Sequence, residues 1–318
     1  MSPSHPSNRV AERLKQEIGL ISDYGGRALA ELSTQRRVFN HMDWWTVEDW
    51  FGSDAFIAVG QAGRVNGAML VAPAVFDDIN RLDTARCDVA WLRWCALRNG
   101  VPAAPVLRQM FDASCAVLRR VGVNRLMCAV ELSCWLVTYL RALGLQREDD
   151  VVTLLLERAE WTIPRTHPVL IDCVVRSANL FDVAGVLEVD HSAFEPLWRL
   201  PADVPVRALQ DKWIFWVGQC DDRLTGYVLA NQLDHEAHIA RLAVHSDYQR
   251  RGIGAALLAD VLTNLFNVRR ARTVTLNTQA SNTAALNLYN RFGFRPLEPL
   301  VRVFRVDLPS VTNCTTQG

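Results

Sequence analysis

The pattern of apolar and polar residues along the 318-residue chain changes repeatedly between helical spacing and short apolar runs. In the first half, helically spaced apolar residues predict helices over 10–21, 105–120 and 135–143. Short apolar runs bounded by turn residues predict strands over 56–60, 67–74, 89–97, 124–130 and 151–158. Helices and strands therefore mix along the chain, which indicates an α/β (α+β) fold.

The same order returns after Pro164 and Pro168, which mark a linker in the middle of the chain. Helices are predicted near 181–191, 254–265 and 281–292, and strands over 170–175, 213–220, 224–232, 236–244, 274–278 and 301–308. One supersecondary plan is thus used twice. We expect two domains, 1–160 and 161–318.

Laying one half on the other shows which residues the halves do not share. A shift of 147 positions places segment 242–258 on the first half, with Pro105 and Leu107 where the second half has glycines. A shift of 149 positions places Leu140 on Tyr289. The fold is therefore expected to be repeated without its special residues.

The special residues of the second half include the stretch QRRGIGAALL, residues 249–258. The helix predicted here has one apolar stripe, formed by Ile253, Leu257, Leu258, Val261, Leu262 and Leu265. Its first backbone N–H groups have no partner within the helix, and glycines let a phosphate approach them. The loop predicts either an anion site or a tight strand-to-helix turn.

Two motifs in the right order tie this loop to a known family. HIARLAVHSDYQRRGIGAALLADVL followed by VTLNTQASNTAALNLYNRFGFRP resembles the GCN5-related N-acetyltransferase (GNAT) superfamily, with its Q/R-x-x-G-x-G/A and N-x-x-A-x-x-L-Y-x-x-x-G-F signatures. The match covers most of residues 236–296, and the second motif is most similar to the branch that acetylates protein N-termini. The resemblance implies two tandem GNAT-like domains. Each has a mixed, mostly antiparallel sheet flanked by helices, with a split between two central parallel strands.

The resemblance also implies acetyl-CoA as the acetyl donor and no metal. Its pyrophosphate is expected on the amides of residues 250–255, and its pantetheine arm along the end of the preceding strand. The implied contacts are Leu242, Ala243, Val244, Gln249, Arg250, Arg251, Gly252, Ile253, Gly254, Ala255 and Asn282.

Tyr289 matches the residue that protonates the departing thiolate in this superfamily. It lies two helical turns after Asn282, on the same face. An aliphatic thiol has a pKa of roughly 8.5 against about 10 for Tyr, so the thiolate needs only modest help. Asn282 also fits a helix N-cap, and Gly293 with Phe294 fits a left-handed C-cap.

The general base departs from the N-terminal acetyltransferase pattern. Where that branch often has Glu, five residues before the motif Asn, this chain has Asn277, which cannot take a proton. Glu236 and His238 share a strand face and are the candidates instead. His238 precedes Ala243 by five residues, the position of the Glu in the histone-acetylating branch, and a His can act as a base near neutral pH. An ordinary strand His is the alternative.

The first half lacks these residues. Its aromatic stretch HMDWWTVEDWF, with Trp44, Trp45 and Trp50, fits either buried packing or the floor of an acceptor pocket. We therefore expect residues 1–160 to be a degenerate, non-catalytic copy that supports the active half.

Composition and charge exclude some classes of function. Lys plus Arg and Asp plus Glu both number 34, so the net charge gives no attraction to nucleic acid or to an anionic membrane. We expect Arg269, Arg270 and Arg272 at a solvated helix end. No run approaches the roughly 20 apolar residues of a membrane span, and no signal peptide is predicted. These patterns favour a cytoplasmic protein.

The cysteines form no C-x-x-C pair and lie mostly in apolar segments. This pattern predicts buried free thiols in a reducing compartment, not a disulfide framework or a zinc site. The eight are Cys87, Cys95, Cys115, Cys128, Cys134, Cys173, Cys220 and Cys314.

Two functions from different classes follow. The first is an acetyl-CoA-dependent N-acetyltransferase that acts on a primary amine of a small molecule or of a protein N-terminus. The second is a non-catalytic acyl-CoA-binding sensor or scaffold, suggested by the missing Glu and the degenerate first half. An intact Tyr289 favours the enzyme.

Overall fold

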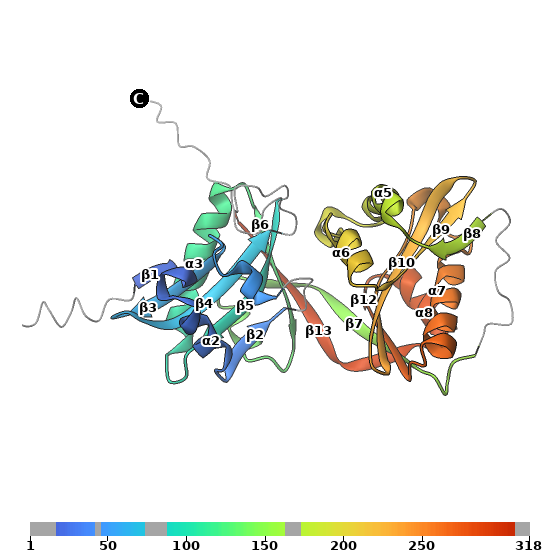
Figure 1. Cartoon of the computed structure of the whole chain (residues 1–318). Coiled ribbons are helices and arrows are strands. Elements are labelled where there is room, and N and C mark those ends of the chain that lie inside the picture. The colour runs from blue at the N-terminus through green and yellow to red at the C-terminus, as the bar shows by residue number, and fades with distance from the viewer. Residues whose placement is uncertain (1–16, 42–45, 74–87, 163–172, 309–318) are drawn as a thin grey trace, which may run out of the picture. The chain divides into compact units, whose positions relative to one another are not determined.

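The computed structural model describes residues 17–41, 46–73, 88–162 and 173–308, which form two compact units. Unit 1 contains the described residues up to Glu148 together with those from Arg302 onward, and unit 2 is Asp149–Val301. Figure 1 labels their elements. The sequence predicts a boundary at 160/161, whereas each observed unit includes part of a strand that begins in the other unit.

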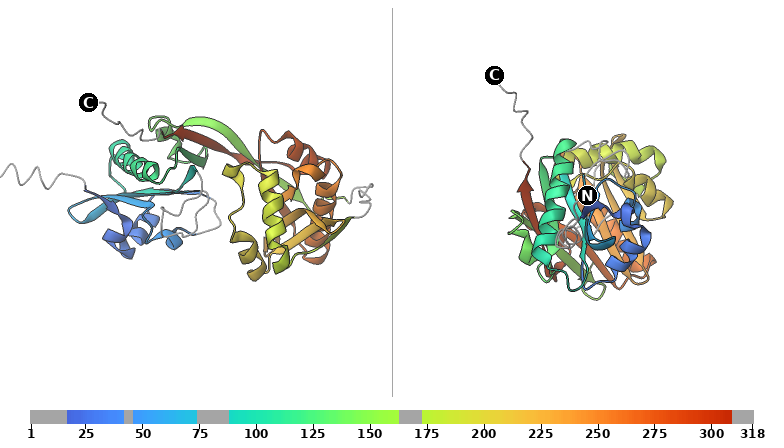
Figure 2. Two further views of the ribbon diagram at one scale, coloured as in Figure 1. Left: turned by 90° about the horizontal axis from the view of Figure 1, so that it is seen from above. Right: turned by 90° about the vertical axis from the view of Figure 1, so that its left-hand side faces the viewer.

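Unit 1 is a mixed sheet with helices on both faces (Figure 2). Its strand order is β1-β3-β4-β5-β6-β13, with β2 paired to β5. The strands that begin in this unit are β1 (Glu17–Leu20), β2 (Arg37–Asn40), β3 (Phe56–Gln61), β4 (Arg64–Pro73), β5 (Val89–Leu97), β6 (Arg125–Glu131) and β7 (Gln146–Glu157). Its α-helices are α2 (Gly26–Ser33), α3 (Ala103–Arg120) and α4 (Val137–Leu140).

Unit 2 repeats this plan with strand order β7-β12-β11-β10-β9-β8. The strands that begin here are β8 (Cys173–Ser177), β9 (Ile214–Cys220), β10 (Arg223–Leu233), β11 (Glu236–Val244), β12 (Thr273–Gln279) and β13 (Arg295–Asp307). Its α-helices are α5 (Val183–Ala193), α6 (Val204–Gln210), α7 (Ile253–Thr263) and α8 (Thr283–Arg291). Helix α7 continues into one π-helical turn, Asn264–Val268.

The strands β7 and β13 each begin in one unit and end in the other. The second part of β7 pairs antiparallel with β12, from Val151↔Gln279 to Glu157↔Thr273. The second part of β13 contributes Phe304 to the buried core of unit 1. Each half of the chain therefore supplies a strand that completes the sheet of the other half.

Most predicted elements are present, with one clear error at the start of the chain. A helix was predicted over 10–21, but Glu17–Leu20 form β1, which pairs antiparallel with β3. The apolar residues Ile18 and Leu20 alternate along this strand, and pairing with a central hairpin overrides their helical spacing. Residues 10–16 of that prediction lie outside the described part. Helix α2, strand β2 and helix α6 were not predicted.

Corresponding positions in the two units have the same irregularities. Both central strand pairs contain a register shift that leaves one extra residue in the later strand, Arg93 in β5 and Ala240 in β11. Both also contain a glycine, Gly67 or Gly226, where an added Cβ would lie 3.0 Å from a backbone oxygen of the next strand. Shared irregularities of this kind support one duplicated fold.

Candidate functional site

The central feature of unit 2 is a split between its two parallel strands. β11 and β12 pair only from Glu236↔Thr273 to Ile239↔Leu276. β11 continues to Val244, paired on its other side with β10. The last residues of β11 therefore have one strand edge that faces no strand of the described chain.

Helix α7 begins just beyond this open edge. Its N-cap, Gly252, has φ 88°, in the left-handed region that favours glycine, and Arg250 is also left-handed with φ 63°. Ala256 donates the first intrahelical bond to the Gly252 carbonyl. Among the described residues, the N–H groups of residues 250–255 have no hydrogen-bond partner. The loop thus presents a run of free donors at the positive end of a helix.

The structure gathers the predicted donor contacts at this place. The helix starts one residue before Gly254, and its predicted apolar stripe is buried. Gly254 lies against Val244, since an added Cβ would be 3.4 Å from that side chain. The arginines stay exposed on the loop: Arg251 donates to the Asp247 carbonyl and stacks on Tyr248. Leu242 and Val244 are partly exposed, and Ala243 is buried.

The second motif forms α8 as expected. Asn282 caps the helix, and its side-chain oxygen accepts from the N–H of Ala285 at 3.1 Å. At the other end Gly293 is left-handed with φ 88°, and the N–H of Phe294 donates to the Tyr289 carbonyl at 3.1 Å. The N-cap and the left-handed C-cap were both predicted, and both are confirmed.

Tyr289 lies in the last turn of α8, so this C-cap fixes its backbone. Its ring packs edge-to-face on Phe294, with centroids 5.9 Å apart, and the residue is 7% exposed. Its hydroxyl has no hydrogen-bond partner among the described residues. Burial raises the pKa of that hydroxyl to about 12, and the positive charge of Arg241 opposes the rise. Tyr289 is therefore protonated at neutral pH and has an unused donor.

His238 lies beside the point where the strands separate. Its Nδ1 is 3.0 Å from the Thr275 hydroxyl oxygen, and that hydroxyl donates to the Ala237 carbonyl at 3.3 Å. With its hydroxyl proton directed to Ala237, the Thr275 oxygen accepts from His238, and this arrangement puts the proton of the neutral imidazole on Nδ1. Burial lowers the pKa of His238. The Nε2 atom is thus an unprotonated acceptor at neutral pH.

His238 also lines a depression of about 290 Å³ on unit 2. Glu236 lies at its rim and is exposed. The lining residues are Asn231, Gln232, Leu233, Glu236, Ala237, His238 and Thr275. Asn277 follows Thr275 on the same face of β12 but does not line the depression. The two candidate bases are therefore brought together.

A buried ionic network beside the split was not found by sequence reasoning. Asp190, fully buried on α5, accepts from the Tyr227 hydroxyl at 2.5 Å and from the Leu200 N–H at 2.7 Å. It is also 2.8 Å from a guanidinium nitrogen of Arg241, which stacks on Phe194. The network ties α5 and the segment after it to β10 and β11. No motif spacing signals it, because its members come from distant parts of the chain.

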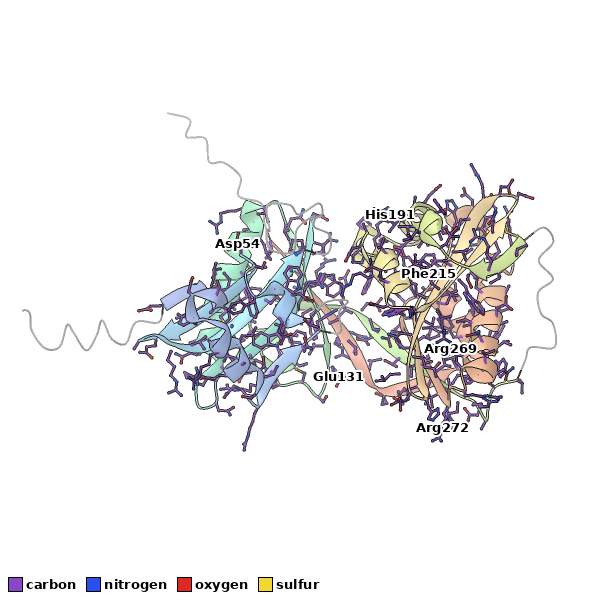
Figure 3. The ribbon with its side chains drawn as sticks, in the orientation of Figure 1. Asp54, Glu131, His191, Phe215, Arg269 and Arg272 are labelled. Carbon is purple, nitrogen blue, oxygen red and sulfur yellow. A yellow bond between two sulfur atoms is a disulfide. The ribbon has the colours of Figure 1, made fainter. Side chains whose placement is uncertain are left out.

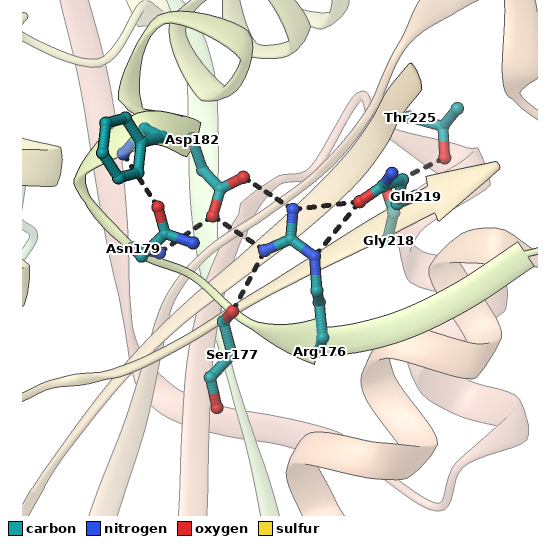
Figure 4. A network of polar contacts seen from close by, with 8 residues as sticks. Arg176, Ser177, Asn179, Asp182, Gly218, Gln219 and Thr225 are labelled. Carbon is teal, nitrogen blue, oxygen red and sulfur yellow. Dashed lines mark hydrogen bonds and ion pairs between the residues drawn. The ribbon is translucent and has the colours of Figure 1, made fainter. Parts of the chain in front are cut away.

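A second network holds the turn before α5, as Figure 4 shows. Arg176 on β8 donates to both Asp182 carboxylate oxygens, at 2.7 and 2.8 Å, and to the Gln219 side-chain oxygen. The Asn179 N–H donates to the same carboxylate. The hydrogen bond to Arg176 lowers the pKa of Asp182. The network fixes an exposed turn on which Phe181 is 97% exposed.

Unit 1 has the same split but no opening. β5 and β6 pair only from Val89↔Arg125 to Trp91↔Met127, yet every residue of β5 is buried. Helix α3 starts at Ala103, so its first turn occupies the positions that correspond to the glycine loop of unit 2. Pro105 in that turn has no N–H to offer. Packing has replaced the anion loop in this unit.

The remaining predictions have mixed outcomes. Trp50 is 2% exposed in the core, whereas Trp44 and Trp45 lie outside the described residues. Arg269, Arg270 and Arg272 are exposed as predicted; Figure 3 labels the first and last. Within the described ranges, no helix is long and apolar enough to span a membrane, and no cluster of His, Cys, Asp and Glu could hold a metal ion.

The prediction of free thiols is wrong for two cysteines. Cys173 and Cys220 are directly opposite on β8 and β9 and form a disulfide. Their pairing follows from the register of two neighbouring strands, which the spacing of 47 residues along the chain does not reveal. Cys95, Cys115 and Cys128 are buried free thiols as predicted, and Cys134 is a partly buried one. Cys87 and Cys314 lie outside the described residues.

Comparison with known proteins agrees with this geometry. Residues 184–294 match the Acetyltransferase (GNAT) family. The chain is 29% identical over 143 residues to an N-alpha-acetyltransferase of Sulfurisphaera tokodaii, covering 40% of this chain and 82% of that protein. It is 27% identical over 136 residues to an uncharacterised N-acetyltransferase of Methanocaldococcus jannaschii, covering 41% and 83%.

Solved structures extend the likeness of fold to both halves. A tandem GNAT protein from the clavulanic acid biosynthesis pathway has a TM-score of 0.58 at 15% identity, covering 93% of this chain and 99% of that one. A GCN5-related N-acetyltransferase from Sphaerobacter thermophilus has a TM-score of 0.60 at 16% identity, covering 95% and 98%. The chain therefore has a tandem GNAT fold. The family match lies within its C-terminal half, and this match together with the relatives indicates N-acetyltransferase activity.

Proposed function

We propose that unit 2 transfers an acetyl group from acetyl-CoA to a primary amine of a small molecule or of a protein N-terminus. The observation that carries the proposal is the open edge of β11 leading to the free N–H groups of residues 250–255. The pantetheine arm of acetyl-CoA fits along the open strand edge, and its pyrophosphate fits the free N–H groups. Gly252 and Gly254 leave room for that approach, because neither carries a side chain.

The residues of the donor site would share the binding. The partly exposed Leu242 and Val244 offer apolar contact to the arm, while the exposed Arg250 and Arg251 offer positive charge to the phosphates. Asn282, already a helix cap, has further amide groups for the same ligand. When bound, acetyl-CoA supplies an activated acyl group with a good leaving thiolate.

His238 is the proposed base. Its Nε2 accepts the proton that the acceptor's ammonium must lose before the amine attacks the thioester carbonyl. The carbon–nitrogen bond then forms as the carbon–sulfur bond breaks. Glu236 lies on the same face and is the alternative base, but it is exposed at the rim of the depression.

Tyr289 is the proposed donor to the departing sulfur. With a pKa of about 12 it is a weaker acid than a thiol of roughly 8.5, so complete proton transfer from it is uphill. Its contribution is a hydrogen bond that stabilises the developing thiolate. Residues 1–160 are proposed to be a non-catalytic copy, because the corresponding split is filled.

The test is release of free thiol from acetyl-CoA in the presence of a panel of amines, polyamines, aminoglycosides and N-terminal peptides. Turnover with at least one acceptor is the expected result. Tight binding of CoA without turnover of any acceptor would instead establish a non-catalytic acyl-CoA sensor.

A further inference from the structure

The depression at the start of β11 is lined by hydrogen-bond acceptors. Glu236 contributes a carboxylate, and His238 an unprotonated Nε2. The Gln232 side-chain nitrogen donates to the carbonyls of Asp234 and Arg269. No Lys or Arg is among the described residues that line this depression. Such a wall favours a ligand that carries positive charge and N–H donors.

The two ionisable groups of the depression have a fixed order relative to the split. Both lie on the face of β11 that also carries Arg241, whose charge is paired with Asp190. His238 is one residue from Ile239, where pairing with β12 ends, and Glu236 is two residues farther away. Two strand residues span about 6.6 Å. An acceptor whose reacting nitrogen is at His238 would therefore place its next few atoms beside Glu236.

We propose that this depression is the acceptor subsite, and that it selects amines with a second positive charge a few bonds from the reacting nitrogen. The reacting amine lies at His238 Nε2, and the second cationic group pairs with the Glu236 carboxylate. A free diamine and a peptide with a cationic second residue share this chemistry. The inference rests on the proposed function, and it assigns Glu236 to specificity instead of catalysis.

The experiment compares acceptors matched in size. Putrescine is compared with n-butylamine, and the peptide Ala-Lys-Ala with Ala-Ala-Ala, by kcat/KM at saturating acetyl-CoA. The native protein should prefer one dication over its matched monocation by about fivefold, since a partly exposed ion pair contributes up to about 1 kcal/mol. The preference should shrink as ionic strength rises. The pair of acceptors that shows this preference tells whether the natural acceptor is a free diamine or a peptide.

Glu236→Gln should abolish the preference for the dication over its matched monocation. Asp234→Asn is the matched control, because it removes an exposed carboxylate that does not line the depression, and it should keep the preference. Binding of the preferred dication to the CoA-bound protein by calorimetry gives a readout without turnover. It should weaken about fivefold in Glu236→Gln.

Two results overturn the inference while the proposed function stands. One is equal kcat/KM for dications and monocations in the native protein, and the other is a preference that survives Glu236→Gln. Absence of thiol release with every amine, at saturating acetyl-CoA, defeats the proposed function itself and with it this subsite.

Discussion

Tyr289 combines burial, a fixed backbone and an unused hydroxyl at the level of a single residue. Tyr289→Phe keeps the ring that packs on Phe294 and removes only that hydroxyl. Folding and CoA affinity should change little. Turnover should fall toward the low end of the roughly 10² to 10⁴ range of a proton donor, because a thiolate needs modest help. Thiol release after fixed reaction times measures turnover, and calorimetric titration with CoA measures affinity.

The control for this substitution is the neighbour in the aromatic pair. Phe294→Leu should loosen the packing and lower the melting temperature without removing a donor. Parental turnover by Tyr289→Phe, under conditions where chemistry limits the rate, would exclude the hydroxyl from the reaction.

His238 makes a prediction about pH. Burial lowers its pKa, so the base is neutral throughout the range above its usual value of about 6.5. Activity should therefore hold from neutral pH down to below 6.5 and then fall as the imidazole is protonated. His238→Gln should remove this acidic limb and slow turnover. The pH dependence of kcat/KM, measured for the native protein and for the variant, checks this prediction, and CoA affinity is the control. An unaltered acidic limb in the variant would mean that a group other than His238 is titrating.

The lowered pKa of His238 also makes the free energy of unfolding depend on pH. A pKa lower in the folded state than in the unfolded state means that the unfolded chain binds more protons below pH 6.5. The contribution of His238 to the free energy of unfolding is therefore complete above that pH and lost as pH falls toward the folded pKa. Removing the imidazole should flatten this part of the stability curve.

The sequence could identify individual functional residues only where they lie close together in one motif. Tyr289 and Asn282 sit in one motif, so their helix and caps were predictable. Arg241 and Asp190 are 51 positions apart and meet only after α5 packs on the sheet. Hydrophobic spacing contains no information about such a pair.

At the level of elements, the start of α7 depends on Gly252. Gly252→Val puts a side chain where φ is 88° and where a phosphate would approach the amides. CoA affinity should fall at least about tenfold, the value of one charge-assisted hydrogen bond. Gly122→Val is the control, because Gly122 is also left-handed, at φ 84°, and has no neighbour within 4 Å of an added Cβ. It should lower stability and leave CoA binding intact; an equal loss of CoA affinity in both variants would refute the assignment of the loop.

The contact between α5 and the sheet depends on Asp190. Asp190→Ala leaves the Arg241 charge without its partner inside the protein and should cost about 3–5 kcal/mol. Asp203→Ala is the matched control, because its ion pair with Arg207 is exposed and contributes below about 1 kcal/mol. Thermal unfolding compares the two. Similar small losses in both variants would show that the buried network contributes little.

The boundaries of elements and their partners differ in how well sequence predicts them. The strands Val89–Leu97 and Glu236–Val244 were predicted with their observed bounds, because most of their residues are apolar and polar loop residues follow them. The strands β7 and β13 were also predicted, but not that each ends in the other unit. Strand partners are set by tertiary pairing, which the residue types of a strand specify only weakly.

At the scale of the whole molecule, duplication gives two splits and one usable site. In unit 1, Val106 and Leu107 are fully buried on α3, which packs on β3 and β4, and Pro105 stands where unit 2 has Gly252 in the sequence. A CoA molecule could bind there only after displacing core side chains, each of which stabilises the fold by about 1.5–3 kcal/mol. We therefore predict one CoA per chain, bound in unit 2. Isothermal titration of the native protein should give a stoichiometry of one, and Gly252→Val should weaken that single event without exposing another. A stoichiometry of two, with one site insensitive to Gly252→Val, would show that unit 1 binds CoA despite its filled split.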